Sequence, residues 1–304
     1  MNVIETRGLT KRFGARTAVD RLNLLVPQGT IYGFLGPNGA GKTTTLRMLV
    51  GLARPTEGEA FVLGTSIADG RRAYLRRIGY LSDAPAFYAW MRASEFLEFV
   101  GRIFGLGGRE LAGRVAEALD LTGLAGIKTR IGGFSRGMKQ RLGLAQALIN
   151  HPELVFLDEP TSALDPIGRK EVLEAIARLA GRTTVFFSTH ILNDVERVCD
   201  IVGILKEGRL IAQKPIHELR ASFAARCLYV EFEGEPDLAL LAGGEPWAGR
   251  VEAWGGGWRF SPPDLRRAQR ELPDFAVRNG FVLRRFELVE PTLEEIFVRL
   301  VNGE

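Results

Sequence analysis

Short apolar runs alternate with amphipathic segments along the first 220 residues of the chain. Three of these runs, residues 30–36, 154–160 and 183–190, are mostly apolar, and the second reaches charged residues only at its C-terminal end. Strands of this kind are typical of a mostly parallel sheet that is covered on both faces. The pattern therefore predicts an α/β domain, and the ligands of such sheets bind at the carboxyl ends of the strands.

Residues 171–180 show a different spacing, which predicts a helix. Their apolar side chains recur at helical intervals and form a stripe that we expect to pack on the core. The residues of the stripe are Val172, Leu173, Ile176, Leu179 and Ala180.

The pattern changes again near Ala221. Residues 227–234 and 250–260 read as strands, the second of them bent or turned at three successive glycines. Residues 262–272 read as a helix that starts with proline. We therefore expect a first domain over residues 1–220 and a small α+β domain over residues 221–304. The last helix of that domain is expected to open with Thr292 and Glu295 in capping-box spacing.

Composition places the chain among ordinary globular proteins. Its 304 residues are 46% hydrophobic and 25% charged, and the formal net charge is +4, which permits an acidic partner but does not require one. Cys199 and Cys227 lie far apart, so neither a disulfide framework nor a zinc site is expected. The N-terminus lacks the apolar core of a signal peptide. The longest uncharged stretch, residues 22–41, contains two prolines and five glycines, so we expect no membrane span there.

The segment "GPNGAGKTT", residues 36–44, follows one expected strand and precedes a helical pattern. Its glycines allow successive backbone N–H groups to face one anion, and the following helix adds its partial positive charge. Lys42 is expected to reach the β- and γ-phosphates, and the Thr43 hydroxyl to ligate Mg²⁺. The sequence therefore predicts a phosphate-binding loop.

An acidic pair ends the strand candidate over residues 154–160. Asp158 is expected to hold Mg²⁺ or its water shell, and Glu159 to orient or deprotonate an attacking water. Such a pair can also be the solvent-exposed end of a strand. The phosphate loop upstream favours the catalytic interpretation.

Four further motifs resemble the nucleotide-binding subunits of ATP-binding cassette (ABC) transporters. "FSRGMKQRL", residues 134–142, resembles the family's signature, and "SALD", residues 162–165, resembles its D-loop. His190 occupies the position of the switch histidine, and Phe13 resembles the aromatic that stacks on adenine. The motifs follow the family's order between residues 3 and 220. Singly, Phe13 could belong to the core and His190 could be structural.

The resemblance implies a P-loop NTPase fold, with a RecA-like core and with antiparallel β and α-helical subdomains, followed by the small C-terminal α+β domain. It implies a head-to-tail dimer that shares two ATP sites, in which the signature faces the γ-phosphate bound to the other copy. Catalysis is expected from Lys42, Glu159 and His190, and Mg²⁺ binding from Thr43, Asp83 and Asp158. The expected ATP contacts are Phe13, Gly36, Pro37, Asn38, Gly39, Ala40, Gly41, Lys42, Thr43, Thr44, Asp83, Ser135, Arg136, Gly137 and Asp165.

Two departures from the family pattern matter. Arg136 and Met138 replace the signature's usual glycine and glutamine, but Ser135 and Gly137 are retained, so anion binding at the helix start is still expected. The alternative is that Ser135 is only a helix cap. Asp83 stands in the Q-loop, where glutamine or glutamate is common, and its shorter reach puts the coupling role of that loop in doubt.

The function expected from this resemblance is ATP hydrolysis that drives export through a separate integral membrane permease. The ending over residues 286–301 and "LDPIGR" resemble ABC-2-type exporters. We expect a homodimer, cytoplasmic and peripheral on the inner face of the cell membrane, with ATP and Mg²⁺ as cofactors and no nucleic acid partner. The alternatives are a soluble ABC ATPase that acts on ribosomes or nucleic acid, and the ATPase of an importer. The transported substrate is not encoded in this chain.

Overall fold

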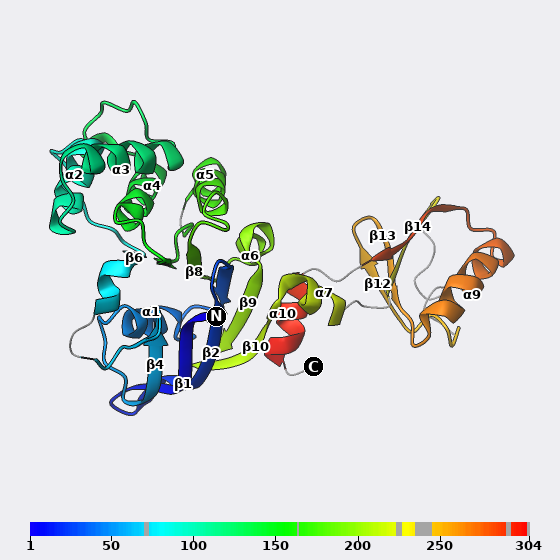
Figure 1. Ribbon diagram of the computed structural model, residues 1–304. Helices are drawn as coiled ribbons and strands as arrows, with labels where there is room; N and C mark the ends of the chain where they lie inside the picture. Colours follow the sequence, from blue (N-terminus) through cyan, green and yellow to red (C-terminus); the bar gives the residue numbers. More distant parts are fainter. Residues whose placement is uncertain (70–72, 163, 223–226, 235–244, 290–292, 303–304) are drawn as a thin grey trace. The chain divides into compact units, whose positions relative to one another are not determined.

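The chain divides into two compact units. A computed structural model describes residues 1–69, 73–162, 164–222, 227–234, 245–289 and 293–302 (Figure 1). The first unit is Met1–Ile216 with the end of the C-terminal helix, α10 (Leu293–Asn302), and the second is His217–Arg299.

The first unit contains two sheets and their covering helices. Its strands are β1 (Asn2–Phe13), β2 (Arg16–Pro27), β3 (Ile31–Leu35), β4 (Glu57–Val62), β5 (Thr65–Ser66), β6 (Ile78–Leu81), β7 (Leu154–Asp158), β8 (Thr184–Thr189), β9 (Ile201–Lys206) and β10 (Arg209–Pro215). Its helices are α1 (Lys42–Leu49), α2 (Ala93–Ile103), α3 (Gly108–Leu121), α4 (Arg136–Leu148), α5 (Pro166–Ala177) and α6 (Leu192–Val198), with 3₁₀ turns η1 (Ala73–Arg77) and η2 (Ile131–Gly133). The helix α7 (Ile216–Ser222) follows β10.

The larger sheet is the mostly parallel one that the apolar runs predict. Its strand order is β10-β9-β3-β8-β7-β6, and only the β10–β9 pair is antiparallel. Every residue of β3, β7 and β8 is buried, which explains their apolar sequences. Leu35 pairs with Thr189, and Asp158 pairs with Ser188. This register brings the phosphate loop, Glu159 and His190 to one edge of the sheet.

A continuous core joins this sheet to the antiparallel sheet β2-β1-β4-β5 and to α1. Tyr32, Phe34, Phe156 and Phe186 supply its aromatic centre, with Phe186 in ring contact with each of the other three. On the opposite face Gly33 lies against Val195 of α6. The phosphate loop thus projects from a strand that is packed on both sides.

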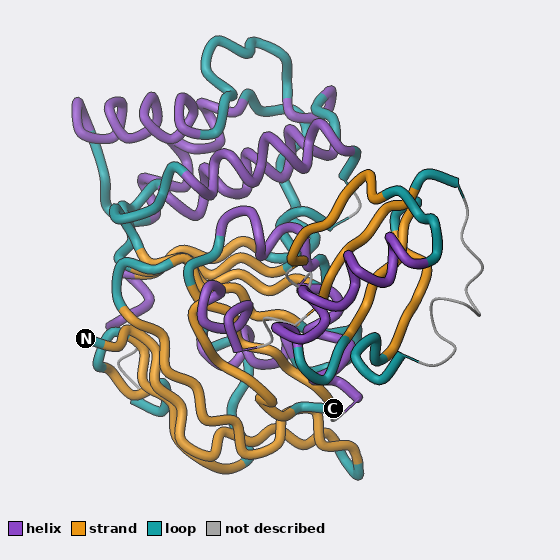
Figure 2. Tube along the Cα trace, turned by 90° about the vertical axis from the view of Figure 1, so that its right-hand side faces the viewer, coloured by secondary structure: helices purple, strands orange, loops and turns teal. Residues whose placement is uncertain are grey.

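Helices α2, α3 and α4 form a layer of their own beside the sheets (Figures 1 and 2). They share a separate apolar core, built around Phe96, Leu97, Val115 and Leu142. The layer carries the signature segment, since α4 begins at Arg136.

The second unit is an antiparallel sheet of order β12-β13-β11-β14, with α9 packed on one face. Its elements are β11 (Cys227–Phe232), β12 (Arg250–Trp254), β13 (Gly257–Ser261), α9 (Leu265–Arg278) and β14 (Leu283–Val289). Buried Arg259 of β13 forms a two-pronged ion pair with Glu295 of α10. The glycines after Trp254 make the β12–β13 turn, as expected.

Two details correct the sequence-based expectations. Ala180 is exposed, because α5 ends at Ala177 and the chain then turns away from the helical stripe. The helix after the double proline begins at Leu265, with Asp264 as its N-cap rather than proline at its start. The capping box expected for α10 stays a prediction, because Thr292 lies outside the described residues. Glu295, its other member, forms the ion pair with Arg259.

Candidate nucleotide site

The phosphate loop curls tightly between β3 and α1. Gly41 has φ 106°, a conformation that side chains disfavour, and a Cβ there would lie 2.4 Å from the carbonyl oxygen of Ala18. Glycine is therefore required at this position. The curl places the start of α1, with its unpaired backbone N–H groups, at the edge of the cavity.

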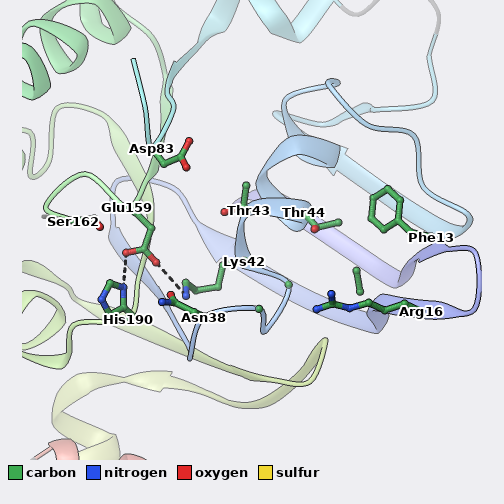
Figure 3. Close-up of a pocket in the computed structure, with 13 residues that line it drawn as sticks. Phe13, Arg16, Asn38, Lys42, Thr43, Thr44, Asp83, Glu159, Ser162 and His190 are labelled. Carbon is green, nitrogen blue, oxygen red and sulfur yellow. Dashed lines mark hydrogen bonds and ion pairs between the residues drawn. The ribbon is translucent and has the colours of Figure 1, made fainter. Parts of the chain in front are cut away.

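Lys42 and Glu159 form the centre of the site. Lys42 Nζ donates to the carbonyl oxygens of Gly36 at 2.6 Å and Pro37 at 3.2 Å, and lies 3.1 Å from Glu159 Oε1. The other carboxylate oxygen, Oε2, lies 2.8 Å from His190 Nδ1. Both side chains of the Lys42–Glu159 pair are largely buried. One carboxylate thus joins the phosphate loop to His190 (Figure 3).

The backbone holds Glu159 in an unusual conformation. Its φ is 49°, in the left-handed region that residues other than glycine rarely adopt. The Glu159 N–H faces both the carbonyl oxygen of Ser188, at 3.1 Å, and the Ser188 hydroxyl, at 3.2 Å. Such strain costs about 1–3 kcal/mol and is concentrated at functional sites. The turn aims the Glu159 side chain into the cavity.

Asp158 is fully buried beside the phosphate loop. Its Oδ1 accepts hydrogen bonds from Thr43 Oγ1 at 3.0 Å and Ser188 Oγ at 2.7 Å. Its Oδ2 is buried without a hydrogen-bond partner. Burial raises the pKa of Asp158, and the charges of Asp83 and Glu159 add to the rise, whereas the two hydroxyl donors oppose it. A cation at Oδ2 would satisfy this oxygen and offset the repulsion.

These residues surround a cavity of about 570 Å³. Its lining is Phe13, Arg16, Ala18, Asn38, Gly39, Gly41, Lys42, Thr43, Thr44, Asp83, Glu159, Ser162 and His190. Phe13 and Arg16 lie at one end of the cavity, and Glu159 and His190 at the other (Figure 3). Phe13 is exposed rather than part of the core.

Within the phosphate loop, three of the expected ATP contacts do not line this cavity. Gly36 and Pro37 instead provide the carbonyl oxygens that hold Lys42, and Ala40 is buried in the core behind the loop. Asp158 also stays outside the lining, since it is covered by Thr43 and Ser188. These four residues therefore contribute to the cavity indirectly, by positioning the residues that line it.

Sequence reasoning missed Arg16 and Ser188. Arg16 pairs with Phe13 across the β1–β2 turn, so its guanidinium reaches the same end of the cavity as the Phe13 ring. The glycine that follows Phe13 could have indicated this hairpin. Ser188 is the residue two before His190, and its role depends on the register between β7 and β8, for which the sequence carries no local signal.

The signature residues and Asp165 lie outside the cavity, at the starts of α4 and α5. Ser135 caps α4 through a hydrogen bond from the Met138 N–H to its Oγ at 3.2 Å, while Asp165 caps α5. Ser135 and Arg136 are exposed, and Gly137 lies against Gly168 of α5. Ser135 therefore does cap the helix, as the alternative expected. Because its oxygen only accepts a hydrogen bond in doing so, its hydroxyl hydrogen remains available to an anion. Residue 163, within the expected D-loop, lies outside the described residues.

The described part of the chain lacks two kinds of feature. No helix there has the length and apolarity that a bilayer crossing requires. No group of three or more His, Cys, Asp or Glu side chains is arranged there to bind a metal ion. A cation beside Asp158 would therefore need further ligands besides His, Cys, Asp and Glu side chains, such as hydroxyl, water or phosphate oxygens.

Known families cover most of the sequence. Residues 19–162 match the family described as ABC transporter, and residues 215–301 match the one described as ATP-binding protein DrrA1-3-like, C-terminal domain. In fold, the chain is similar to the dimeric post-hydrolysis state of the ATP-binding cassette MJ0796 bound to ADP and phosphate. That match has a TM-score of 0.63 at 25% identity and covers 70% of this chain and 98% of the other.

Two named relatives match over nearly their whole length. The bacitracin transport ATP-binding protein BcrA of Bacillus licheniformis is 40% identical over 99% of this chain and 98% of its own length. The daunorubicin resistance ATP-binding protein DrrA3 of Streptomyces coeruleorubidus is 35% identical over 99% of this chain and 96% of its own. The chain belongs to the ATP-binding proteins of ABC transporters, and it is a nucleotide-binding ATPase of that family.

Proposed function

We propose that this chain is the ATP-hydrolysing subunit of an exporter, working with a separate membrane permease. The observation that carries the proposal is the convergence of Lys42, Glu159 and His190 on one cavity beside the phosphate loop. The relatives named for bacitracin transport and daunorubicin resistance support the direction of transport. Residues 1–220 would form the ATPase domain and residues 221–304 its C-terminal domain.

The cavity suits one ATP molecule laid along its length. Phe13, at one end, presents an exposed ring on which adenine can stack. The loop amides and the start of α1 then receive the phosphates. Lys42, which in this state pairs with Glu159, exchanges that carboxylate for the β- and γ-phosphate oxygens.

The residues around Asp158 fit a magnesium ion. Its unpaired buried oxygen, Oδ2, and its raised pKa both indicate a position where a cation would be stabilising. Thr43 Oγ1 lies 3.0 Å from the other carboxylate oxygen of Asp158, Oδ1. Thr43 and Asp83 both line the cavity. We propose these three side chains as the protein's contribution to the Mg²⁺ site. Bound there, Mg²⁺ would neutralise charge that develops on the phosphate oxygens.

Glu159 would act on the attacking water and His190 on the γ-phosphate. When Lys42 turns to the phosphates, Glu159 Oε1 becomes free to accept a hydrogen bond from that water. The water oxygen bonds to the γ-phosphorus, the bond to the ADP oxygen breaks, and Glu159 orients the water or accepts its proton. His190, held by Glu159 Oε2, presents its other nitrogen to the γ-phosphate.

The residues outside the cavity are proposed to complete the site of a second copy. Exposed Ser135 and Arg136, with the N–H of Gly137, lie at the start of α4, where an anion is favoured. Asp165 caps the neighbouring helix. A homodimer would then contain two equivalent ATP sites, each built from both copies.

The permease surface is proposed to lie on the helical layer. Phe87 and Phe96 pack together in its core, whereas Tyr88, Trp90 and Phe99 are exposed, and the Tyr88 ring centroid lies 6.0 Å from each of the other two. A cluster of exposed aromatic side chains is typical of a protein interface. Docking there would hold the chain at the inner face of the membrane.

Purification of the tagged chain from its own cells in mild detergent tests this proposal. We expect a polytopic membrane protein to co-purify, and replacement of Trp90 by Ser to reduce its recovery. Recovery of ribosomal proteins or nucleic acid instead would support a soluble ABC ATPase. A solute-binding protein in the complex would indicate an importer. Either result would contradict the exporter proposal.

Replacement of Phe13 by Ala is expected to weaken ATP binding about tenfold, because stacking of a base on an aromatic ring contributes about 1–3 kcal/mol. Turnover at saturating ATP should stay near the parental rate, since the ring is at the far end of the cavity from Glu159. Titration with a fluorescent ATP analogue measures the affinity. Phe13→Tyr should restore it, and Phe99→Ala, at another exposed ring, is the control. Equal affinities for Phe13→Ala and the parent would remove Phe13 from the adenine site.

A further inference from the structure

A buried carboxylate outside the cavity connects the segments that carry the proposed catalytic residues. Asp194, in α6, is fully buried. Its Oδ2 accepts a hydrogen bond from Thr161 Oγ1 at 2.5 Å, and its Oδ1 accepts one from Arg169 Nε at 2.6 Å. Thr161 is itself buried and Arg169 partly so. Three separate stretches of chain therefore meet at one side chain.

Each member of this cluster lies close in sequence to a residue of the site. Thr161 is two residues beyond Glu159, and the Ser162 N–H donates to the Glu159 carbonyl oxygen at 3.1 Å, which closes the turn between them. Asp194 is four residues beyond His190. Its N–H donates to the carbonyl oxygen of Ile191, the residue directly after His190, at 3.2 Å. The bond between Thr161 and Asp194 thus joins the same two segments as the 2.8 Å contact between Glu159 and His190.

Arg169 extends the cluster to the start of α5. Its backbone N–H donates to the Asp165 carbonyl oxygen at 2.9 Å, in the first turn of the helix that Asp165 caps. The guanidinium supplies the positive charge that a fully buried carboxylate needs. Both carboxylate oxygens have their hydrogen-bond donors only while all three segments stay together, which makes the arrangement rigid.

We infer that Asp194 is a positioning residue for hydrolysis, which fixes the distance between Glu159 and His190 through its hydrogen bond from Thr161. The inference rests on the roles proposed above for Glu159 and His190. Glu159 is held in a strained backbone conformation, which persists only where its surroundings enforce it. Loss of the Thr161–Asp194 bond releases one of those restraints. Misplacement of reacting groups by about 1 Å can lower a rate about 100-fold.

The variant Thr161→Val tests the inference most cleanly, because it removes the hydroxyl, keeps the side-chain shape and leaves the Asp194–Arg169 ion pair intact. We expect kcat to fall about tenfold or more, with the Kd for ATP unchanged within about twofold. Thr161→Ser, which keeps the hydroxyl, should restore most of the rate. Asp194→Asn is a second variant. In the folded fraction of this variant we again expect a lower kcat and an unchanged Kd for ATP.

Thr122→Val is the matched control. Thr122 is also buried, and its hydroxyl donates to the Ala118 carbonyl oxygen at 2.8 Å within α3, away from the cavity lining. It should lower the thermal midpoint as Thr161→Val does, without lowering kcat. A parental kcat for Thr161→Val, or an equal fall in both valine variants, would overturn the inference. Failure of the underlying catalytic roles would show separately, as parental hydrolysis by Glu159→Gln.

Discussion

Replacement of Glu159 by Gln is expected to lower ATP turnover about a thousandfold while ATP binding is kept. The amide retains the size of the side chain but cannot accept a proton from water. It also ends the ion pair with Lys42, whose ammonium still has the carbonyl oxygens of Gly36 and Pro37 as partners. Lys42 is then freer to bind phosphate, so the affinity for ATP should equal or exceed that of the parent. Single-turnover hydrolysis and equilibrium titration measure the two quantities.

Glu207→Gln provides a control with the same chemistry. Glu207 also has φ 49°, but it is exposed in the turn between β9 and β10 and does not line the cavity. Its replacement should leave turnover unchanged. Hydrolysis by Glu159→Gln at the parental rate would remove Glu159 from catalysis. Loss of ATP binding would show instead that the Lys42–Glu159 pair serves mainly to hold the phosphate loop.

Apolar runs and the glycine-rich loop were sufficient to predict the centre of the fold. The strands β3, β7 and β8 are apolar because both faces of their sheet are covered, and that condition is visible in the sequence itself. The phosphate loop is predictable for a similar reason, since Gly41 is required by its own backbone conformation. Asp158 and Glu159 could be predicted as site residues because they lie at the end of an apolar strand.

The contacts that arrange the site could not be predicted in this way. The bond between Thr43 and Asp158 joins residues 115 positions apart, and its existence depends on which strands are neighbours. The same holds for the cluster of Thr161, Arg169 and Asp194, whose members look like ordinary helix and turn residues in the sequence. In the C-terminal unit the ion pair between Arg259 and Glu295 joins residues 36 positions apart, and the spacing of Glu295 within its helix does not indicate it. Local spacing carries no information about such partners.

Replacement of Asp158 by Asn is expected to lower the rate of Mg²⁺-dependent hydrolysis about a hundredfold or more, and at the same time to stabilise the nucleotide-free protein. Burial and the neighbouring carboxylates make the ionised side chain unfavourable in the fold, which is why its pKa is raised. The amide oxygen still accepts from Thr43 and Ser188, but no charge is buried. Function and stability therefore make opposite demands at this residue.

The sign of the pH dependence follows from the raised pKa. Below the ordinary pKa of an aspartate, about 3.9, the carboxyl is protonated in both states and contributes no difference. Between that value and its raised value in the fold, only the unfolded chain releases the proton, so the stability of the parent falls as pH rises. The stability advantage of Asp158→Asn should grow across this interval and then become constant.

Thermal unfolding with and without Mg²⁺ and ATP measures both effects. The parent should gain stability from the ligands, because they bind only the folded state, whereas Asp158→Asn should gain little. Asp120→Asn, an exposed aspartate on α3, should change neither quantity. A lower unfolding midpoint for nucleotide-free Asp158→Asn would mean that the hydrogen bonds from Thr43 and Ser188 need the full charge of the carboxylate. In that case the fold would tolerate the unpaired Oδ2 oxygen, and that oxygen would not support a Mg²⁺ site at Asp158.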